Sequence, residues 1–476
     1  MPRLRDPHGF STSGRGQLRH EAARETGLET ELIKRDLGKL LLKLEELQEE
    51  KNKIDLEAEA YEMTAEEKEE ALKFLRAADL VERIRKAFDD CGLVGEDTNK
   101  LVAYLSCCSR KLDHPLAVII QSTSAAGKST LMEAVLNMMP EEEKIKYSAM
   151  TGQSLYYLGE TNLKHKILAI VEEEGAEKAS YALKLLQSEG ELTIASTGKD
   201  EQGRMKTEEY RVEGPVMIFL TTTAVEIDEE LLNRCLILTV DESREQTRKI
   251  HELQRKSRTR EGIIAKHKKK KIRALMKNVQ RLIKPYDIYN PFADQLTFTS
   301  ESTRTRRDHE KYLNLIDTIT LLHQHQREIT EIEIDGHKSE QITTTLEDIE
   351  LANKLAPEVL GRSLDELPPQ TRRIWGMIGD LVKQIAEGEE KKHCLFSRRQ
   401  VREFSGWSEY QVRVHMQKLE DMEYIGRRSG RQGSLCLYQL LLDAENKTTA
   451  CPIGLTDIKK LKKERGSATY GEQLRA

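Results

Sequence analysis

The sequence predicts an α/β fold in which helices cover a parallel sheet, with helical segments before and after it. Short apolar runs rich in β-branched residues alternate with helical or loop segments between residues 76 and 243; these runs are Leu116–Ile120, Ile167–Val171, Val216–Leu220 and Leu236–Val240. Runs that are apolar throughout are typical of strands buried on both faces of a parallel sheet. Charged residues make up 33% of the chain and aromatic residues 5%, which favours a helix-rich protein with long solvated faces.

The length of 476 residues suits about three domains, and composition shifts mark their boundaries. We expect a helical N-terminal arm with a disordered start (1–75), followed by the α/β core (76–243). A basic and mainly helical region that forms a lid (244–365), a helix-turn-helix module (366–445) and a flexible polar tail (446–476) come after it.

Bulk properties limit the function classes. The net charge of −5 excludes polyanion binding through the field of the whole chain, so any nucleic-acid site must come from local clusters. The sequence has no run of about 18 apolar residues and no apolar core of a secretion signal, so we expect no membrane partner and a cytoplasmic location. The seven cysteines form no Cys-x-x-Cys pair, which predicts a reducing compartment and no zinc.

A phosphate-binding loop follows the first apolar run. The segment Ser122-Thr-Ser-Ala-Ala-Gly127-Lys128-Ser129-Thr130 leads into an apolar helix and follows the pattern G-x-x-x-x-G-K-[ST], with Ser122 replacing the first glycine. Small residues let backbone N–H groups surround phosphates at a helix N-terminus, Lys128 can reach the β- and γ-phosphates, and the Ser129 hydroxyl can ligate Mg²⁺. The sequence therefore predicts ATP and Mg²⁺ as cofactors, bound by Ser122, Ser124, Gly127, Lys128, Ser129 and Thr130; the alternative is a structural small-residue turn before a helix.

Acidic residues end the second apolar run, as P-loop ATPases require. Glu172 is the candidate Mg²⁺ ligand and Glu173 the residue that polarises the attacking water, although Glu174 leaves the register uncertain by one position. A solvated acidic loop is the alternative. After the third run, Thr222 or Thr223 would orient the lytic water, a role for which Asn is commoner, and we select Thr222.

Two arginines are candidates for contacts with the nucleotide. Leu231-Leu-Asn-Arg234 before an apolar run matches the arginine-finger position of AAA+ proteins, from which Arg234 would stabilise the γ-phosphate held by a neighbouring subunit. The site would then be complete only in an oligomer. The alternative is a surface arginine that caps the C-terminal end of a helix. From the lid, Arg306 is the candidate within Thr303–Arg307.

A hairpin and a basic segment are candidates for contact with nucleic acid. Two strand-like runs between Glu191 and Val212 flank a polar, glycine-containing tip, where Lys199, Arg204 and Lys206 would contact DNA phosphates in the channel of a hexameric motor. An exposed hairpin without this role is the alternative. Residues 244–284 hold sixteen Lys and Arg against three acidic residues, a pattern typical of a solvated helix or of nonspecific phosphate contact.

The C-terminal module has the pattern of a winged helix. A helix at Ser397–Phe404 with a capping box is followed by a Ser-Gly-Trp turn, a second helix from Ser408, an Arg/Gly-rich wing and the strand Leu435–Leu440. Predicted DNA contacts are Gln411, Arg413, Arg427, Arg428 and Arg431, and His415 and Lys418 are expected on the same polar helix side. Docking of a protein is the alternative.

With these motifs, the chain from about Gln17 to Leu442 resembles the C-terminal ATPase portion of bacterial mobile-element DNA primase-like proteins, whose longer members begin with a CHC2-type zinc finger and a toprim domain. The resemblance is carried by Thr26-Gly-Leu28, Gly152-Gln-Ser-Leu-Tyr-Tyr157, Gly159-Glu160, Leu185-Gln-Ser-Glu-Gly-Glu-Leu192, Leu231-Leu-Asn-Arg234, Leu321-Leu-His-Gln-His325, Leu367-Pro-Pro-Gln-Thr371 and Phe396-Ser-Arg-Arg399. The core is also distantly similar to minichromosome-maintenance helicases through its helix-plus-hairpin insert before the third core strand. Zinc-ligand spacing and the Asp-x-Asp pair of toprim chemistry are missing from this sequence, so the resemblance implies a helicase half without primase activity and a separate primase as partner.

The leading hypothesis is an AAA+ ATPase that acts as a hexameric DNA translocase or helicase, on single-stranded or forked DNA, in replication of a mobile element. Two alternatives remain open. One is an ATP-dependent loader or remodeller that does not unwind DNA, and the other is a DNA-binding initiator or regulator in which ATP is only a switch.

Overall fold

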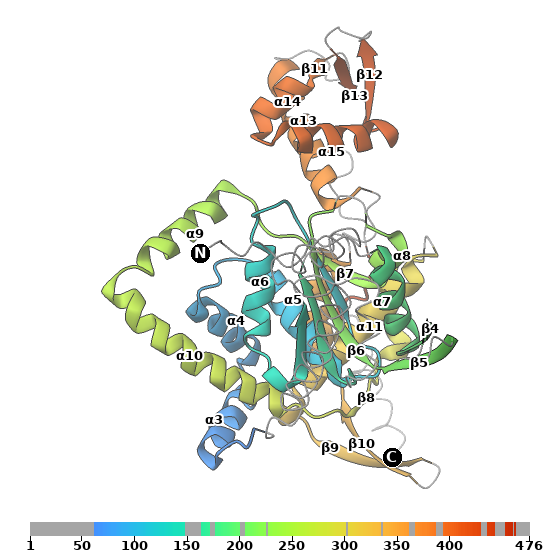
Figure 1. Ribbon diagram of the computed structural model, residues 1–476. Helices are drawn as coiled ribbons and strands as arrows, with labels where there is room; N and C mark the ends of the chain where they lie inside the picture. Colours follow the sequence, from blue (N-terminus) through green and yellow to red (C-terminus); the bar gives the residue numbers. More distant parts are fainter. Residues whose placement is uncertain are drawn as a thin grey trace, which may run out of the picture. The chain divides into compact units, whose positions relative to one another are not determined.

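The computed structural model divides the chain into two compact units, Met1–Thr64 and Ala65–Ala476 (Figure 1). The N-terminal arm expected at residues 1–75 lies outside the described residues up to position 60, and its last part is helix α3 (Ala65–Leu75). Among the described residues, no helix is both long and apolar enough for a membrane crossing. The structure describes residues 61–147, 163–171, 177–199, 205–224, 227–300, 303–334, 337–360, 367–386, 394–429, 436–442, 453–459 and 461–462.

A five-stranded sheet forms the centre of the second unit. Its strands are β1 (Ala117–Gln121), β2 (Lys144–Tyr147), β3 (Lys166–Val171), β6 (Val216–Thr222) and β7 (Cys235–Leu238). They run parallel in the order β2-β3-β6-β1-β7. The parallel sheet is therefore confirmed, and each of the four apolar runs forms a strand. Strand β2 was not predicted, because its sequence Lys-Ile-Lys-Tyr contains no apolar run at this half-exposed edge.

The two faces of the sheet are packed by different helices. Val118 and Ile120 of β1 belong to one core cluster, together with helices α4 (Leu80–Cys91), α5 (Asp97–Cys108) and α6 (Lys128–Leu136). Ile119 points to the other face and packs with residues of α7 (Glu177–Glu189) and α8 (Glu229–Leu232) (Figure 1). Each buried aliphatic side chain contributes about 1.5–3 kcal/mol, so both faces stabilise the fold.

The hairpin expected before the third predicted core strand is present. Strands β4 (Glu191–Lys199) and β5 (Met205–Glu213) pair antiparallel, from Glu191 with Glu213 to Lys199 with Met205. The base of the hairpin is anchored in the core, because Leu192 and Val212 pack in the same cluster as α7. The hairpin thus extends from a fixed base between α7 and β6.

The region 244–365 holds four long helices and a small sheet. The elements are α9 (Arg244–Lys256), α10 (Arg260–Arg281), β8 (Asp287–Tyr289), α11 (Thr305–Leu322), β9 (Ile329–Ile334), β10 (His337–Thr343) and α12 (Leu346–Val359). A mainly helical lid was expected, but β8, β10 and β9 form a three-stranded sheet. The alternation Glu-Ile-Glu-Ile at the end of β9 has the period of a strand, and this signal was missed.

The C-terminal module contains helices α13 (Pro369–Ala386), α14 (Arg398–Ser405) and α15 (Glu409–Asp421), with strands β11 (Leu395–Ser397), β12 (Ile425–Ser429) and β13 (Leu437–Leu440). Both short helices begin with the expected capping boxes, Ser397 with Gln400 and Ser408 with Gln411. The strands form one antiparallel sheet.

Part of the C-terminal tail packs on the core, although a flexible polar tail was expected. Ile453 is 5% exposed within the main core cluster, and its carbonyl accepts a hydrogen bond from the Thr299 amide at 2.8 Å. The Thr456 hydroxyl donates to the Gln295 carbonyl and accepts from the Thr297 amide, both at 2.8 Å. An apolar residue and a side-chain hydroxyl therefore anchor a segment whose composition is polar.

Candidate nucleotide-binding site

The phosphate-binding loop joins β1 to α6 and has the backbone shape that its residue types predict. Gly127 has φ of +105° and precedes α6 directly, and Ala125 has φ of +63°. Left-handed backbone at these two positions turns the chain tightly between strand and helix. Amides in the first turn of α6 have no carbonyl four residues earlier to bind, so they can donate to an anion. The side chains of Ser124, Ser129 and Thr130 are exposed around this turn.

Lys128 places a positive charge inside the loop. Its side-chain nitrogen donates to the carbonyl oxygens of Ser122 at 3.1 Å and Thr123 at 2.8 Å, and the residue is only 6% exposed. A buried ammonium group held by backbone carbonyls is a strong local attraction for an anion. The loop therefore provides both a cation and a helix N-terminus at one point.

Ser122, which replaces the first glycine of the consensus, has a structural role. Its hydroxyl accepts a hydrogen bond from the Val240 amide at 2.9 Å, and Ser122 is 2% exposed. Val240 follows β7, which lies beside β1 in the sheet. The hydroxyl thus ties the start of the loop to the neighbouring chain segment, and glycine cannot provide this bond.

The sheet order brings the carboxyl ends of β3, β6 and β1 side by side. Strand β6 lies between β1 and β3, and Thr222 at its end is in register with Gln121, the last residue of β1. Thr222 is 2% exposed, and its hydroxyl accepts from the Ala224 amide at 3.0 Å, whereas Thr223 is exposed. Glu172 and Glu173 follow directly after β3 but lie outside the described residues. In open parallel sheets, ligands bind beyond the carboxyl ends of the strands.

Arg234 has partners within its own subunit. Its guanidinium donates to the Ser188 hydroxyl at 2.8 Å and to the Glu230 carbonyl at 3.2 Å, and it pairs with the Glu230 carboxylate at 2.9 Å. Its side chain is 15% exposed. Arg234 therefore caps the end of α8 in this single chain, as the alternative to the arginine finger describes. For Arg234 to contact a nucleotide bound by a neighbouring subunit, its bonds with Ser188 and Glu230 would have to break.

The lid arginines differ in their surroundings. Arg304 lies 4.0 Å from the carboxylate of Asp308, a fully buried residue that also pairs with Lys311 at 2.6 Å. Burial lowers the pKa of Lys311, and the Asp308 carboxylate opposes this effect. Arg306 is exposed and has no ion pair with a described residue. Of these two arginines, Arg304 lies beside a buried carboxylate, and Arg306 stays the candidate for nucleotide contact.

Sequence reasoning missed Glu242, which joins the loop to the C-terminal module. Its carboxylate accepts hydrogen bonds from the Thr123 amide at 3.1 Å, the Gln370 side chain at 3.0 Å and the Arg373 guanidinium at 3.1 Å. The side chain is 12% exposed. No motif marks this glutamate, and only the fold brings α13 to the loop.

The predicted DNA-binding residues fall into three groups. Lys199 and Lys206 lie at the distal end of the β4–β5 hairpin, in a register that pairs Lys206 with Gly198. Arg413, Arg427 and Arg428 are exposed in the C-terminal module. Arg413 lies over the ring of Tyr410 at 5.6 Å, and Tyr410 is 66% exposed. Arg204 and Arg431 lie outside the described residues.

Two side chains of α15 have structural roles. The Gln411 side chain accepts from the amide of Ser408 at 3.0 Å as part of the capping box, so it is engaged at the start of the helix. The placement of His415 on the polar side was wrong. His415 is 2% exposed and hydrogen-bonded to the Thr371 hydroxyl at 3.0 Å, and burial lowers its pKa to about 4.

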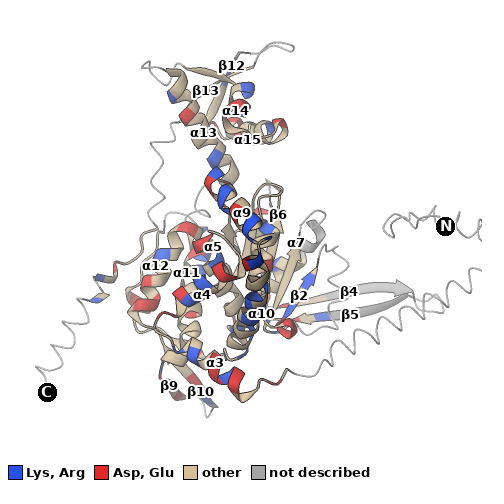
Figure 2. Ribbon diagram, turned by 90° about the vertical axis from the view of Figure 1, so that its left-hand side faces the viewer, with Lys and Arg blue, Asp and Glu red and all other residues tan. Residues whose placement is uncertain are grey.

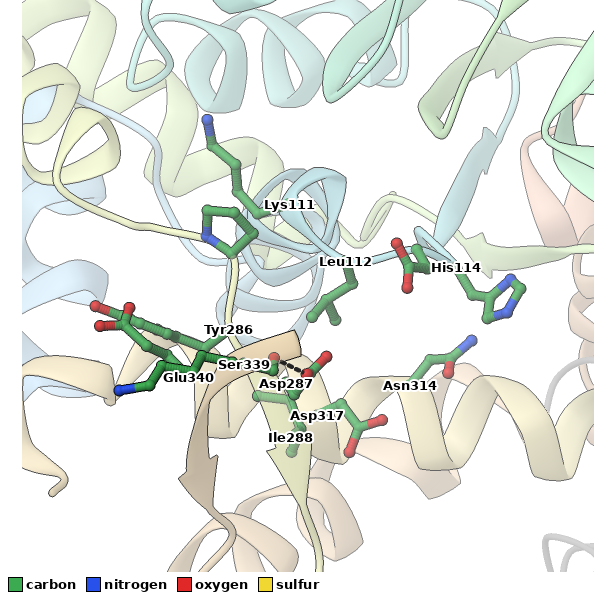
Figure 3. A pocket seen from close by; sticks show the side chains of 13 residues that line it. Lys111, Leu112, His114, Tyr286, Asp287, Ile288, Asn314, Asp317, Ser339 and Glu340 are labelled. Atoms are coloured by element: carbon green, nitrogen blue, oxygen red, sulfur yellow. Dashed lines mark hydrogen bonds between the residues drawn. The ribbon is translucent and has the colours of Figure 1, made fainter. Parts of the chain in front are cut away.

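A separate cavity of about 570 Å³ lies at the opposite edge of the sheet. His114, which precedes β1, lies on the same side of it as Asn314 of α11, and Asp317 and residues of β8 and β10 line the rest (Figure 3). Asp113 is also among the lining residues. Burial raises the pKa of Asp317 to about 7, and the charge of Glu310 adds to this effect. The cavity takes no part in the nucleotide site, which is built at the carboxyl ends of the strands.

The fold and the loop define an α/β P-loop core, the class of domain that binds nucleoside triphosphates. Comparison with protein families agrees, because residues 62–285, just under half of the chain, match the family described as "MTBMA_p00010 P-loop domain". No curated protein matches the sequence.

Two solved structures show weak likeness to this chain. The full-length MCM homolog from Methanopyrus kandleri is 12% identical, with 64% of this chain and 63% of that chain covered and a TM-score of 0.40. NtrX from Brucella abortus in complex with ADP is also 12% identical, with 51% and 66% covered and a TM-score of 0.23. This chain therefore spans slightly less than two thirds of either structure.

Proposed function

We propose that this chain hydrolyses ATP at the loop of Lys128 and uses hydrolysis to move along DNA. The observation that carries the proposal is the strand order β3-β6-β1. It places the ends of three strands side by side: the strand before the phosphate loop, the strand that ends at Thr222, and the strand that Glu172 and Glu173 follow. If the two carboxylates lie beside the end of β3, they would form with Lys128 and Thr222 a suitable set for phosphoryl transfer to water.

The residues of the loop fit a nucleotide with Mg²⁺. The ammonium of Lys128 and the first turn of α6 would bind the phosphates, and Ser129 with Glu172 would hold the metal ion. Bound Mg²⁺ supplies positive charge against the phosphate oxygens. Glu173 would accept a proton from the attacking water while Thr222 orients it. Arg234 of a neighbouring subunit would stabilise charge on the γ-phosphate, which makes the active form a ring oligomer.

Two parts of the chain would engage DNA. Lys199, Arg204 and Lys206 at the end of the β4–β5 hairpin would contact the phosphate backbone, and hydrolysis would shift the hairpin along the strand. The hairpin is suited to this because its base packs with α7 and with side chains of β3 and β6 on one face of the sheet. In the C-terminal module, Arg413 with Tyr410, Arg427 and Arg428 offer exposed cations and an aromatic ring. A role beside a separate primase in replication of a mobile element follows from the sequence resemblance.

Strand displacement on a forked DNA substrate tests this proposal. We expect ATP-dependent unwinding by the wild-type protein and none by the Lys128→Ala variant. A triple Lys199→Ala, Arg204→Ala, Lys206→Ala variant should keep basal ATP hydrolysis and lose both DNA stimulation and unwinding. DNA-stimulated hydrolysis without unwinding would identify a loader or remodeller instead. Full DNA stimulation in the triple variant would refute the role of the hairpin.

A further inference from the structure

Helices α9 and α10 form a V-shaped arm, which is anchored where each helix meets the core and turns sharply at its tip (Figure 1). At the base, the side chain of Gln246 is buried and donates to the Val94 carbonyl at 2.6 Å, and Val279 packs with α3. At the tip, Thr259 caps α10 by accepting from the Gly262 amide at 3.2 Å. A Cβ atom on Gly262 would lie 2.4 Å from the Lys256 carbonyl oxygen, so the turn is too close for a side chain.

The cations of this arm divide by position. Near the base they are neutralised by the core, since Lys277 pairs with Glu141 and Arg281 with Glu142, at 2.5 and 2.7 Å. Toward the tip, a set of exposed cations has no ion pair with a described residue; its members are Arg255, Lys256, Arg258, Arg260 and Lys266. Lys270 and Lys271, in the middle of α10, are also exposed and have no such pair. Figure 2, which views these helices from the side of their tip, shows Lys and Arg along them.

This charge is a local feature. Sixteen Lys and Arg stand against three acidic residues in 244–284, whereas the whole chain has a net charge of −5. Exposed cations repel one another, and either mobile counterions or an external polyanion reduces this repulsion. Charge complementarity therefore favours the phosphate backbone of a nucleic acid as the partner of this surface.

The tip also carries an apolar pair. Ile263 and Ile264 in the first turn of α10 are 61% and 64% exposed, more than any other aliphatic side chain among the exposed large hydrophobic residues of the described part. Covering a side chain of this size is worth about 1.5–3 kcal/mol. Apolar side chains beside a basic surface are what proteins use to pack against or between bases that are unstacked or single-stranded.

We propose that α9 and α10 form a nucleic-acid-binding arm whose tip cations bind phosphates and whose Ile263–Ile264 pair packs on unstacked bases. The arm is a third contact with nucleic acid, separate from the β4–β5 hairpin and the C-terminal module. Its binding does not require ATP hydrolysis, and only its use during movement rests on the proposed function.

The test is fluorescence anisotropy of the full chain with a labelled oligothymidine, measured over a range of salt concentrations. The charge variant is Arg255→Gln, Lys256→Gln, Arg258→Gln, Arg260→Gln. The slope of log K against log salt is negative, and each lost phosphate contact on a single strand lowers its magnitude by about 0.7. We therefore expect the magnitude of the slope to decrease by about 3 in this variant. The matched control, Lys68→Gln, Lys73→Gln, Lys338→Gln, Lys354→Gln, changes net charge equally at exposed positions elsewhere and should leave the slope unchanged.

The apolar tip has its own variant, Ile263→Ser with Ile264→Ser. We expect weaker binding with the same salt slope.

Unchanged binding in both arm variants would overturn the proposal. If light scattering also showed an altered oligomeric state in these variants, the tip would cover a second copy of the chain instead of a nucleic acid. DNA-independent ATP turnover together with arm-dependent binding would refute the motor and support the arm. Stimulated turnover with no arm dependence would do the reverse.

Discussion

Restoring the glycine of the phosphate-loop consensus at position 122 should damage this protein. The Ser122 hydroxyl accepts the Val240 amide at 2.9 Å, and both residues are buried, at 2% and 8% exposure. Ser122→Gly removes the acceptor and leaves the amide without a partner in a site closed to water. An unsatisfied buried donor costs about 1–3 kcal/mol, and the greater chain freedom of glycine adds about 0.5–1 kcal/mol. We therefore expect a total loss of about 1.5–4 kcal/mol.

Urea unfolding followed by far-UV circular dichroism measures this loss. Tryptophan fluorescence is unsuitable, because both tryptophans, Trp375 and Trp407, lie in the C-terminal module. Hydrogen–deuterium exchange gives a local readout, since the Val240 amide should exchange faster in the variant. Ser124→Gly is the matched control: the same change in the same loop at an exposed side chain should cost less than about 1 kcal/mol. Equal stability of Ser122→Gly and wild type, with unchanged exchange at Val240, would refute the reasoning.

Three further predictions concern titration and the subunit contact. Because the pKa of Asp317 is raised to about 7, the folded wild-type protein loses stability as pH rises from about 4 to 7. The free energy of unfolding of Asp317→Asn, relative to wild type, should therefore be about 2–3 kcal/mol higher at pH 8 than at pH 5 in urea unfolding. The lowered pKa of His415, about 4, gives the opposite pH dependence: stability is lost as pH falls from about 6.5 to 4, by up to about 3 kcal/mol. The fluorescence of Trp407, whose ring lies against His415, should report this loss in urea unfolding. Stability that does not change over this pH range would contradict a buried neutral imidazole. If Arg234 acts on a neighbouring subunit, mixing the inactive Arg234→Ala and Lys128→Ala proteins should restore part of the ATP hydrolysis, because a mixed ring holds some intact sites; no recovery would contradict a shared site.

The sequence predicted the core because its signals are local. The strand-loop-helix around Lys128 depends on consecutive residues: an apolar strand, small residues that allow left-handed backbone, and the start of a helix. The capping boxes at Ser397 and Ser408 are local in the same way, and both are present. Sheet order could only be expected from the class of fold, since no residue pattern states which strands lie side by side.

Features that depend on distant contacts could not be predicted. His415 has the polar character of a surface residue, and only the approach of Thr371 from α13 makes it a buried neutral imidazole. Glu242 and Ser122 acquire their roles from partners more than 100 positions away in the chain. The docked segment around Ile453 is another case, because Ile453, Leu455 and Ile458 pack on the core from within a tail that is polar as a whole.

ATP hydrolysis by the purified chain, with and without single-stranded DNA and beside the Lys128→Ala variant, tests the central claim most directly. We predict turnover that rises on addition of DNA and is lost in the variant, because the Lys128 ammonium is the cation held at the centre of the loop. Turnover that DNA leaves unchanged, or a Lys128→Ala protein with full activity, would contradict an ATP-driven DNA motor built on this loop.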